Sequence, residues 1–462
     1  MTTTTAPIDR QNTVPGGAPP GRRGHIGRIV AGSLGGGLIA AALSTLVLVP
    51  GATEPVVTGL MLVSLALGWL SLWHFARRRT DQPQAWALVL AAAFGVTGAV
   101  LLALAPGEEA LAGAGWLWPP ALVVLVTWTV TKARTSLRSG SRQVLLYPVL
   151  LALFVVAIGG FYEAVQGTRG TDDLTATGQL YDVGGHHLWM SCTGSGSPTV
   201  VLESGLGEPS APMSAWIAPA VAADTRVCVY DRAGYGRSGP SDVTTSGESI
   251  VNDLRTLLEV AGEPGPYVLA GHSTGAVYVR LFADAYPDEV AGVVLLDGQS
   301  PDAMAELPAY PAFYAGFRRL EALAPTLARF GVARLATGLV GSDLPMPQRA
   351  ESEATWSTPA HFRTLRDEIA ALPESLSAAH DAGPLGTVPL VVVTAEKDAQ
   401  DGWLPLQDAL ARLSADTVHL RLAHATHSSL VQDPEDAAVA ASAITRVVTA
   451  VRTHRPVTQV TP

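Results

Sequence analysis

Charged residues are scarce in this sequence, and its first third holds nearly all of the long runs without any. Only 15% of the 462 residues are Asp, Glu, Lys or Arg, while 48% are hydrophobic, so the chain is more apolar than most soluble proteins and longer than one average domain. Five stretches without any of these four residue types approach the ~20 apolar residues that cross a bilayer: 29–49, 56–75, 85–105, 111–131 and 144–162. Because they lack the amphipathic stripe of buried helices in soluble proteins, we expect a transmembrane region over residues 26–162.

Two details qualify these spans. Pro119 and Pro120 interrupt the first half of the fourth stretch, so this helix is expected to start late or to be kinked. The first stretch begins late and four similar ones follow it, which favours a retained helix over a cleaved signal peptide. Residues 1–25 are rich in Thr, Pro, Gly and Arg, so a disordered cytoplasmic tail is expected there.

The distribution of basic residues predicts the orientation of the spans. Lys and Arg occur before the first span, after the second and after the fourth, whereas the alternate connections carry only acidic charges, at Glu54, Glu108 and Glu109. The basic residues are Arg10, Arg22, Arg23, Arg28, Arg77, Arg78, Arg79, Lys132, Arg134, Arg138 and Arg142. Because basic connections stay in the cytoplasm, we expect a multi-pass protein of the cell membrane with a cytoplasmic N-terminus and everything after Tyr162 outside. The bilayer is therefore an expected partner, with the spans as an anchor.

Cysteine is nearly absent, and basic residues are outnumbered in the rest of the chain. Cys192 and Cys228 are the only cysteines, which excludes a disulfide scaffold and a thiolate metal site; no metal and no cofactor is expected. After Tyr162 there are 19 Lys plus Arg and 35 Asp plus Glu, a formal charge of −16. Such a charge repels phosphate backbones, so no nucleic-acid partner is expected.

The remainder of the chain alternates between strand and helix patterns after a polar linker at residues 163–177. Residues 179–183 and 187–192 flank Gly184 and Gly185 and predict a hairpin. Short apolar runs predict further strands at 199–202, 226–230, 267–270, 292–296, 390–394 and 418–422, and helical patterns cover 250–261, 274–285, 404–413 and 435–451. This alternation predicts an α/β domain over residues 178–455, with a mostly parallel sheet covered on both faces. The interval from about 299 to 385 has helical character and is expected to form a cap.

A serine between two glycines follows the strand at 267–270. The segment Gly271-His272-Ser273-Thr274-Gly275 leads from that strand directly into a helix. At such a sharp turn only glycine lets the backbones pass closely enough to expose the hydroxyl. We therefore expect Ser273 to be a catalytic nucleophile.

A serine nucleophile needs an oriented base and a carboxylate, and both are expected at the ends of other strands. Asp398 follows the strand at 390–394, and His427 follows the last strand, which gives the order serine, acid, histidine. We predict Asp398 as the acid and His427 as the base. Alternatives remain for each role: Asp297 ends the strand before the cap, and His424 lies three residues before His427.

The negative charge that develops on a carbonyl oxygen requires two donors, usually backbone amides. We expect one from Thr274, at the start of the helix behind the nucleophile. The other should come from the glycine turn Ser204-Gly205-Leu206-Gly207, with Leu206 as the donor.

With these motifs in order, residues from about 178 to 452 resemble the α/β-hydrolase superfamily, in particular its capped esterases, lipases and peptidase-like members. The segment from Tyr230 to Gly239 (YDRAGYGRSG) resembles the family's loop after the fourth strand, and Pro434 matches a proline that often starts its last helix. The resemblance implies an α/β-hydrolase fold with Ser273, Asp398 and His427 as the triad. It also implies that the strands of Cys192 and Cys228 lie near each other, as a disulfide or as two buried thiols. Many relatives have His-Gly where this chain has Ser204-Gly205, which should alter loop support more than catalysis because the donor is a main-chain amide.

The function expected from these residues is serine hydrolysis of an ester, or secondarily an amide, of a hydrophobic small substrate through an acyl-enzyme. An envelope acyltransferase using the same triad is an alternative, because transfer differs only in the acceptor. A non-catalytic membrane binding protein is a third, although such a protein would be expected to lack a triad member.

Overall fold

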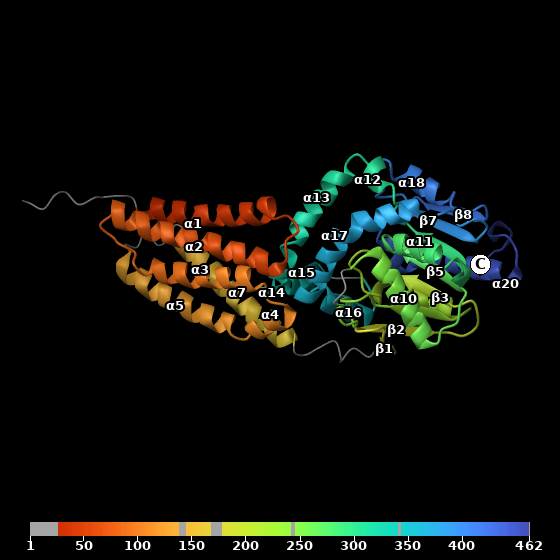
Figure 1. Cartoon of the computed structure of the whole chain (residues 1–462), viewed down its shortest axis with the longest axis horizontal. Helices are drawn as coiled ribbons and strands as arrows, with labels where there is room; N and C mark the ends of the chain where they lie inside the picture. Colours follow the sequence, from red (N-terminus) through yellow and green to blue (C-terminus); the bar gives the residue numbers. More distant parts are fainter. Residues whose placement is uncertain (1–25, 138–144, 168–177, 242–244, 341–342, 462) are drawn as a thin grey trace, which may run out of the picture.

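A computed structural model of the chain describes residues 26–137, 145–167, 178–241, 245–340 and 343–461. Figure 1 shows two parts side by side along the longest axis, an all-helical N-terminal part and an α/β part. The predicted tail at 1–25 and residues 168–177 of the predicted linker lie outside the described residues.

The N-terminal part contains apolar helices of membrane-spanning length, as the sequence predicts. Four helices are long and apolar enough to cross a membrane, and a bent pair with an angle of 42° between its members makes up to five. The helices are α1 (Ile26–Leu43) with its continuation η1 (Ser44–Leu48), α2 (Glu54–Arg79), α3 (Ala87–Leu104), the bent pair α4 (Glu108–Ala114) and α5 (Trp118–Ser136), and α7 (Leu146–Gly167).

The break between α4 and α5 lies just before the two prolines. Pro119 and Pro120 occupy the first turn of α5, where a residue without an N–H group costs no helical hydrogen bond. Helix α5 therefore begins at Trp118, later than the expected start of the fourth span.

Helix α7 continues to Gly167, beyond the expected span end at Tyr162, so the first residues of the predicted linker are helical.

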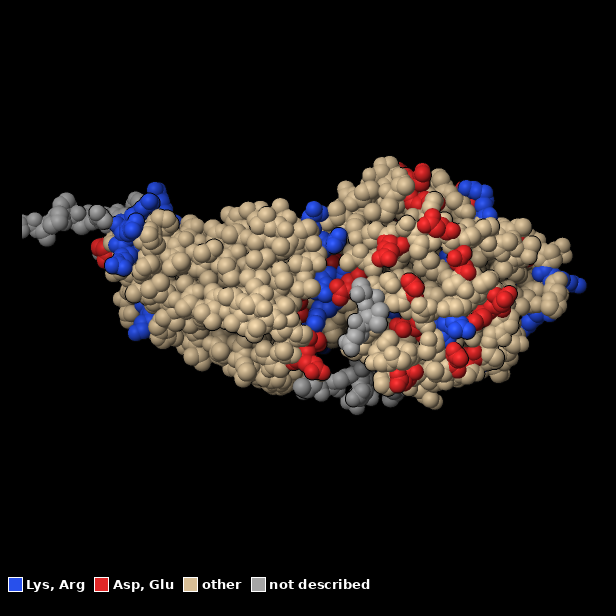
Figure 2. All heavy atoms as spheres, in the orientation of Figure 1, with Lys and Arg blue, Asp and Glu red and all other residues tan. Residues whose placement is uncertain are grey.

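Charges mark the two ends of the helical part. Arg77, Arg78 and Arg79 form the last turn of α2, and Arg134 lies in the last turn of α5. Figure 2 shows basic residues gathered at the end of the helical part that is far from the sheet, whereas acidic and basic residues meet at the junction with the α/β part.

The α/β part is built on one sheet of eight strands in the order β1-β2-β4-β3-β5-β6-β7-β8. The strands are β1 (Gln179–Asp182), β2 (His187–Thr193), β3 (Val200–Glu203), β4 (Val227–Tyr230), β5 (Tyr267–His272), β6 (Val290–Leu296), β7 (Leu390–Ala395) and β8 (Thr417–Leu422). Strands β1 and β2 form the expected antiparallel hairpin at one edge, β2 pairs antiparallel with β4, and the other pairs are parallel. The mostly parallel sheet is confirmed.

Helices cover both faces of this sheet, which explains why β3, β4, β5 and β7 are buried along their whole length. Successive residues of each strand point to opposite faces of the sheet. The helices on one face pack against a cluster that includes Val268 and Val391, and the helices on the other face pack against a cluster that includes Leu269 and Val392. The first face carries α8 (Ala211–Ala215), α9 (Ile217–Ala222), α19 (Ser429–Gln432) and α20 (Pro434–Thr453); the second carries α10 (Gly247–Ala261), α11 (Gly275–Ala285) and the end of α18 (Trp403–Leu410).

The interval after β6 is a helical cap between the sheet and the apolar N-terminal helices (Figure 1). Its helices are α12 (Ala303–Glu306), α13 (Tyr310–Glu321), α14 (Ala324–Arg329), α15 (Val332–Val340), α16 (Gln348–Thr355) and α17 (Pro359–Asp381). The cap contacts the helical part directly, since α14 packs against α2 and α7 and α13 packs against η1.

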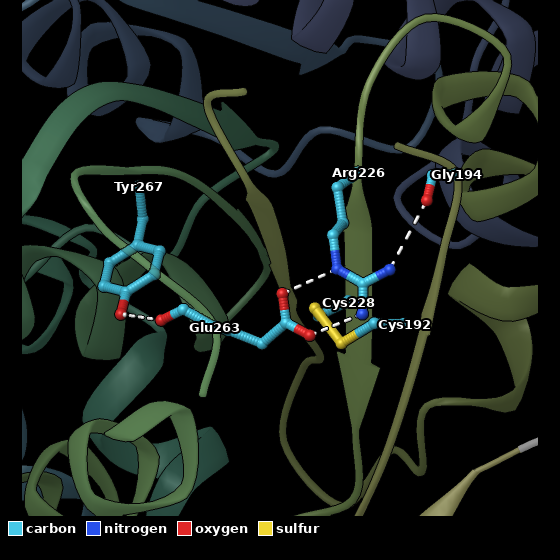
Figure 3. The surroundings of a disulfide bond; sticks show 6 residues. All are labelled: Cys192, Gly194, Arg226, Cys228, Glu263 and Tyr267. Atoms are coloured by element: carbon cyan, nitrogen blue, oxygen red, sulfur yellow. Dashed lines mark hydrogen bonds and ion pairs between the residues drawn. A yellow bond between two sulfur atoms is a disulfide. The ribbon is translucent and has the colours of Figure 1, made fainter. Parts of the chain in front are cut away.

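Cys192 and Cys228 form a disulfide bond between β2 and β4, where they face each other in the antiparallel register. Figure 3 shows the ion pair of Arg226 and Glu263 beside it, with 2.5 Å between Arg226 Nη2 and Glu263 Oε1. Because both sulfur atoms are bonded to each other, they are not available as thiolate ligands. The sequence left two alternatives for this pair, a disulfide or two buried thiols, and the structure has the disulfide.

Candidate active site

Ser273 lies at a strained turn between β5 and α11. Its φ is +53°, a left-handed conformation that non-glycine residues adopt mainly where the surrounding structure enforces it. A Cβ on Gly271 would lie 2.5 Å from the carbonyl carbon of Gly275, and a Cβ on Gly275 would lie 2.4 Å from the carbonyl oxygen of Glu203. Both glycines are therefore required for the turn to pack, as the sequence argument anticipates.

His427 lies beside this turn, and the carboxylate that contacts its ring belongs to Asp297. The distance from His427 Nδ1 to Asp297 Oδ2 is 2.6 Å, and Asp297 is 2% exposed. Its other oxygen, Oδ1, accepts a hydrogen bond from Trp403 Nε1 at 2.9 Å. A buried carboxylate held by an indole N–H is well suited to fix the ring in one orientation.

Asp398, which the sequence predicts as the acid, makes no hydrogen bond to the imidazole ring in the part of the chain that the structure describes. Asp398 is exposed, and its carboxylate accepts from the backbone N–H of His427 at 3.0 and 3.2 Å. The strand order does not decide between the two, since β6 lies next to the nucleophile strand β5 and β7 lies next to β8, which the histidine follows. The physical reason is that the Asp398 carboxylate is already bound to the backbone N–H of His427, whereas the buried Asp297 carboxylate reaches the ring. Asp398 holds the histidine loop, and Asp297 holds the histidine ring.

The alternative histidine lies apart from this cluster. His424 Nε2 is 3.0 Å from Asp436 Oδ1, and its side chain is 72% exposed. His427, in contrast, has its ring centroid 4.8 Å from that of His272, the residue before the nucleophile. Within the described residues, Ser273 Oγ makes no hydrogen bond to His427 Nε2; such contacts are often loose before a substrate is bound.

The two predicted oxyanion donors lie on the two turns that meet at Ser273. A Cβ on Gly205 would lie 3.1 Å from Ser273 Cβ, so the turn that carries Leu206 touches the nucleophile. Among the hydrogen bonds of the described residues, none uses the backbone N–H of Leu206 or of Thr274. Both amides therefore remain available to an oxygen at this position.

A buried pair that the sequence analysis did not identify supports both turns. His272 Nδ1 lies 3.2 Å from Glu208 Oε2, and its Nε2 lies 3.0 Å from the carbonyl oxygen of His427. Glu208 also accepts from the N–H of Gly205 at 3.2 Å. Burial lowers the pKa of His272, but the Glu208 carboxylate, together with the His427 carbonyl and the Asp297 carboxylate, raises that pKa overall. His272 is visible in the sequence within the nucleophile motif, but its partner Glu208 follows only from the fold.

A second buried network links the oxyanion turn to the cap. Arg232 donates to the carbonyl oxygens of Ser204 and Gly205, at 2.8 and 2.6 Å. Its guanidinium also pairs with Glu203 at 2.8 Å and with Glu368 of α17 at 3.1 Å. Tyr230 donates to Glu203, and Tyr235 and Tyr278 donate to Glu368. Burial raises the pKa of Glu203, while Arg232 acts in the opposite direction.

The Arg232 network has a partial signal in the sequence. Arg232 and Tyr235 belong to the YDRAGYGRSG segment that carries the family resemblance. Glu368, in contrast, lies in the middle of a cap helix without any motif, so no pattern identifies it.

The cap closes the site with an apolar wall. Leu206 packs with Tyr235, Leu365 and Ile369 and with the neighbouring aromatic residues Phe362 and Trp356. An acyl group attached to a carbonyl held at the oxyanion turn would therefore meet apolar side chains.

Comparisons with known proteins identify relatives of the α/β part. Residues 200–441 match the sequence profile described as the alpha/beta hydrolase family. A monoacylglycerol lipase of Mycolicibacterium smegmatis is 28% identical over 220 residues, which are 46% of this chain and 75% of that protein. An uncharacterized protein of Schizosaccharomyces pombe is 26% identical over 430 residues, which are 82% of this chain and 76% of that protein. Because 82% of the chain is more than the α/β part alone contains, the latter similarity extends into the N-terminal helices.

Among solved structures, a crystal structure of DBJA aligns with a TM-score of 0.50 and 19% sequence identity. The alignment covers 60% of this chain and 100% of that one. At this identity the likeness shows the fold of the α/β part.

Proposed function

Because the chain belongs to the alpha/beta hydrolase family, we propose that it is a membrane-anchored serine hydrolase that cleaves esters with an apolar acyl group. The observation that carries this proposal is the buried Asp297 carboxylate, 2.6 Å from His427 Nδ1, next to a serine held at a φ of +53°. A strained serine beside a carboxylate-oriented imidazole is the arrangement that activates a hydroxyl.

The proposed reaction uses these groups in two steps. His427 Nε2 takes the Ser273 proton as Oγ attacks the ester carbonyl, and the N–H groups of Leu206 and Thr274 stabilise the oxyanion. The imidazolium then protonates the leaving alcohol, and an acyl-enzyme remains. Water then attacks the acyl carbonyl as His427 takes its proton, and the imidazolium returns a proton to Ser273 Oγ as the acyl–oxygen bond breaks and the acid is released. Asp297 keeps the proton on Nδ1 and stabilises the imidazolium throughout.

Two features support an active site outside the cytoplasm. The basic residues of α2 and α5 lie at the end of the helical part that is far from the α/β part (Figure 2), as expected if that end faces the cytoplasm. The Cys192–Cys228 disulfide is typical of oxidising compartments. The name of the Mycolicibacterium relative, a monoacylglycerol lipase, supports an acyl ester as substrate.

Substitution of the nucleophile tests the proposal. The purified full chain with Ser273→Ala should lose at least ~10³-fold in kcat/KM for small chromogenic esters, because removal of the nucleophile leaves only binding and oxyanion stabilisation. The matched control is Ser377→Ala, which removes an exposed hydroxyl from α17 and should leave turnover unchanged. Turnover by Ser273→Ala at the rate of the control would overturn the assignment.

A further inference from the structure

A large cavity lies between the membrane helices and the cap. Its volume is about 1100 Å³, which exceeds the ~300–1,000 Å³ of most small-molecule sites. The walls come from α4 and α7 on one side and from α16, α17 and the loop after β4 on the other. In Figure 1 these helices meet at the junction of the two parts.

The two walls differ in polarity. The wall from the membrane helices consists mainly of small and aromatic residues, together with Glu108 and Glu163, whose carboxylates pair with arginines of the cap. The wall from the cap carries mostly hydroxyl and charged groups. The first includes Ala112, Gly113, Gly115, Trp116, Gly160 and Ala164; the second includes Thr355, Thr358, Arg363, Thr364, Asp367 and Glu374. A cavity with a mainly apolar wall opposite a mainly polar one matches an amphiphile better than a wholly polar or wholly apolar molecule.

Ion pairs hold the cap against the outer ends of the helices. Arg329 of α14 contacts Glu54 at 3.0 Å and Glu108 at 2.9 Å. Arg334 of α15 contacts Glu163 at 2.8 Å. Both Glu54 and Glu163 are buried, so these pairs fix the position of the cap and therefore the width of the cavity.

Polar groups without protein partners lie at the cap wall. His361 lines the cavity, is 1% exposed, and has neither ring nitrogen hydrogen-bonded within the described residues. Arg366 Nη1, on the same helix, is likewise buried without a partner in that part of the chain. Unpaired buried polar groups are costly, and a polar head group that reached this wall after a small side-chain movement would provide acceptors and donors for them.

The cavity is separated from the oxyanion turn by one layer of side chains. A Cβ on Gly207 would lie 2.9 Å from Leu365 and 3.4 Å from Trp356. The Trp356 ring, in turn, lies against the His361 ring with 4.4 Å between their centroids. Rotation of Trp356 and Leu365 would therefore connect the cavity to the site of Ser273.

The surface around the cavity continues the apolar surface of the spans. Helices α13 and α15 leave the junction with large side chains exposed: Phe313 by 60%, Leu320 by 61%, Leu335 by 66% and Leu339 by 78%. Exposed apolar side chains next to the ends of membrane helices are expected to enter the lipid boundary.

From these observations we propose that the cavity binds a membrane lipid ester and is the route by which the substrate reaches Ser273 from the outer leaflet. The acyl chains lie against α4 and α7, and the polar head lies against α17. The proposal rests on the proposed hydrolase function and adds the substrate class and its binding site.

Crosslinking tests binding without catalysis. Full-length Ser273→Ala protein in phosphatidylcholine nanodiscs is irradiated with a diacylglycerol whose acyl chain carries a diazirine, and the labelled peptides are mapped. We expect labels on the walls of the cavity, and at least a tenfold loss of those labels with the additional substitution Gly113→Trp, because a Cβ there meets open space and the indole would project into the cavity where the acyl chain is proposed to lie. The control is Gly316→Trp on α13, where a Cβ also meets open space outside the cavity walls, and it should retain the labels. Labels confined to lipid-facing residues of the spans, or equal labelling in Gly113→Trp, would overturn the proposal.

Turnover then tests the route. With active protein in vesicles, Gly113→Trp should lower the ratio of diacylglycerol to soluble short-chain ester turnover at least tenfold relative to Gly316→Trp. An unchanged ratio would show that the cavity is not on the substrate's path. Failure of the hydrolase proposal itself would be seen separately, as persistent turnover in Ser273→Ala, while the crosslinking result would stand.

Discussion

At the scale of single residues, the two carboxylates near His427 have separable roles. Asp297→Asn should lower kcat by about 10³–10⁴-fold, because an amide no longer holds the proton on Nδ1 of His427 and no longer stabilises the imidazolium. The measurement is steady-state kinetics on a soluble ester, with the folded state checked by thermal unfolding.

Asp398→Asn is the matched control for that substitution. Its carboxylate accepts from the backbone N–H of His427 at 3.0 Å, and an amide oxygen can accept the same bond, so kcat should stay within about threefold. A large loss with Asp398→Asn and a small one with Asp297→Asn would restore the assignment that the sequence alone favours.

The Glu208–His272 pair predicts a pH dependence of stability. Burial opposes charge on both groups, but their mutual attraction raises the pKa of His272 above 6.5 and lowers the pKa of Glu208 below 4.5. The contribution of His272 is therefore complete below pH 6.5 and is lost as the pH rises through its raised pKa. The contribution of Glu208 is complete above pH 4.5 and is lost as the pH falls through its lowered pKa.

The pair should therefore stabilise the fold most between pH 4.5 and 6.5. Chemical denaturation of the full chain and of Glu208→Gln should differ by about 1–3 kcal/mol in this range and by less at pH 9. A difference that is constant from pH 5 to pH 9 would contradict an ionised pair.

What the sequence predicts at this scale depends on whether a residue lies in a local pattern. Ser273 follows from its glycines because the steric demand of the turn is local. The choice between Asp297 and Asp398 is not local: both follow strands of the sheet, and only the folded loops decide which carboxylate meets the ring and which one binds the backbone N–H of His427. Glu208 and Glu368 carry no motif at all.

At the scale of secondary-structure elements, Arg232 joins β4, the oxyanion turn and α17. Arg232→Met should destabilise the chain by about 3–5 kcal/mol, because it leaves the buried carboxylates of Glu203 and Glu368 without their counter-ion. It also removes the donors to the carbonyl oxygens of Ser204 and Gly205, so kcat should fall as well. Denaturant unfolding and ester turnover measure the two effects.

The control for this substitution is Arg255→Met. Arg255 pairs with Glu289, and the two side chains are 43% and 33% exposed, so the expected loss is at most about 1 kcal/mol. Equal losses for the two variants would show that the Arg232 network contributes no more than a surface ion pair.

Most elements follow from hydrophobic patterns, because buried parallel strands and amphipathic helices have distinct periods. The predicted hairpin and the strands at 267–270 and 390–394 correspond to β1 and β2, β5, and β7. Helix ends are less predictable: α7 continues to Gly167 because Glu163, a polar residue that suggests a linker, is buried against Arg334.

At the scale of the whole molecule, the arrangement of the two parts is what the sequence could not give. The apolar stretches predict spans, and the strand pattern predicts a sheet, each from short segments. The contact between them depends on Glu54, Glu108 and Glu163 meeting arginines more than 170 residues away in the chain. Such long-range ion pairs leave no local pattern, and neither does the cavity that they enclose.

The most direct test of the central claim is labelling of Ser273 from outside the cell. Intact cells carrying the full chain are treated with a membrane-impermeant, sulfonated fluorophosphonate, and the modified residue is mapped by mass spectrometry. We predict a covalent phosphonyl adduct on Ser273 without permeabilisation, and no adduct in Asp297→Asn over the same short exposure. Absence of the adduct even in permeabilised cells would contradict the serine hydrolase, and an adduct that forms only after permeabilisation would contradict the outward-facing site.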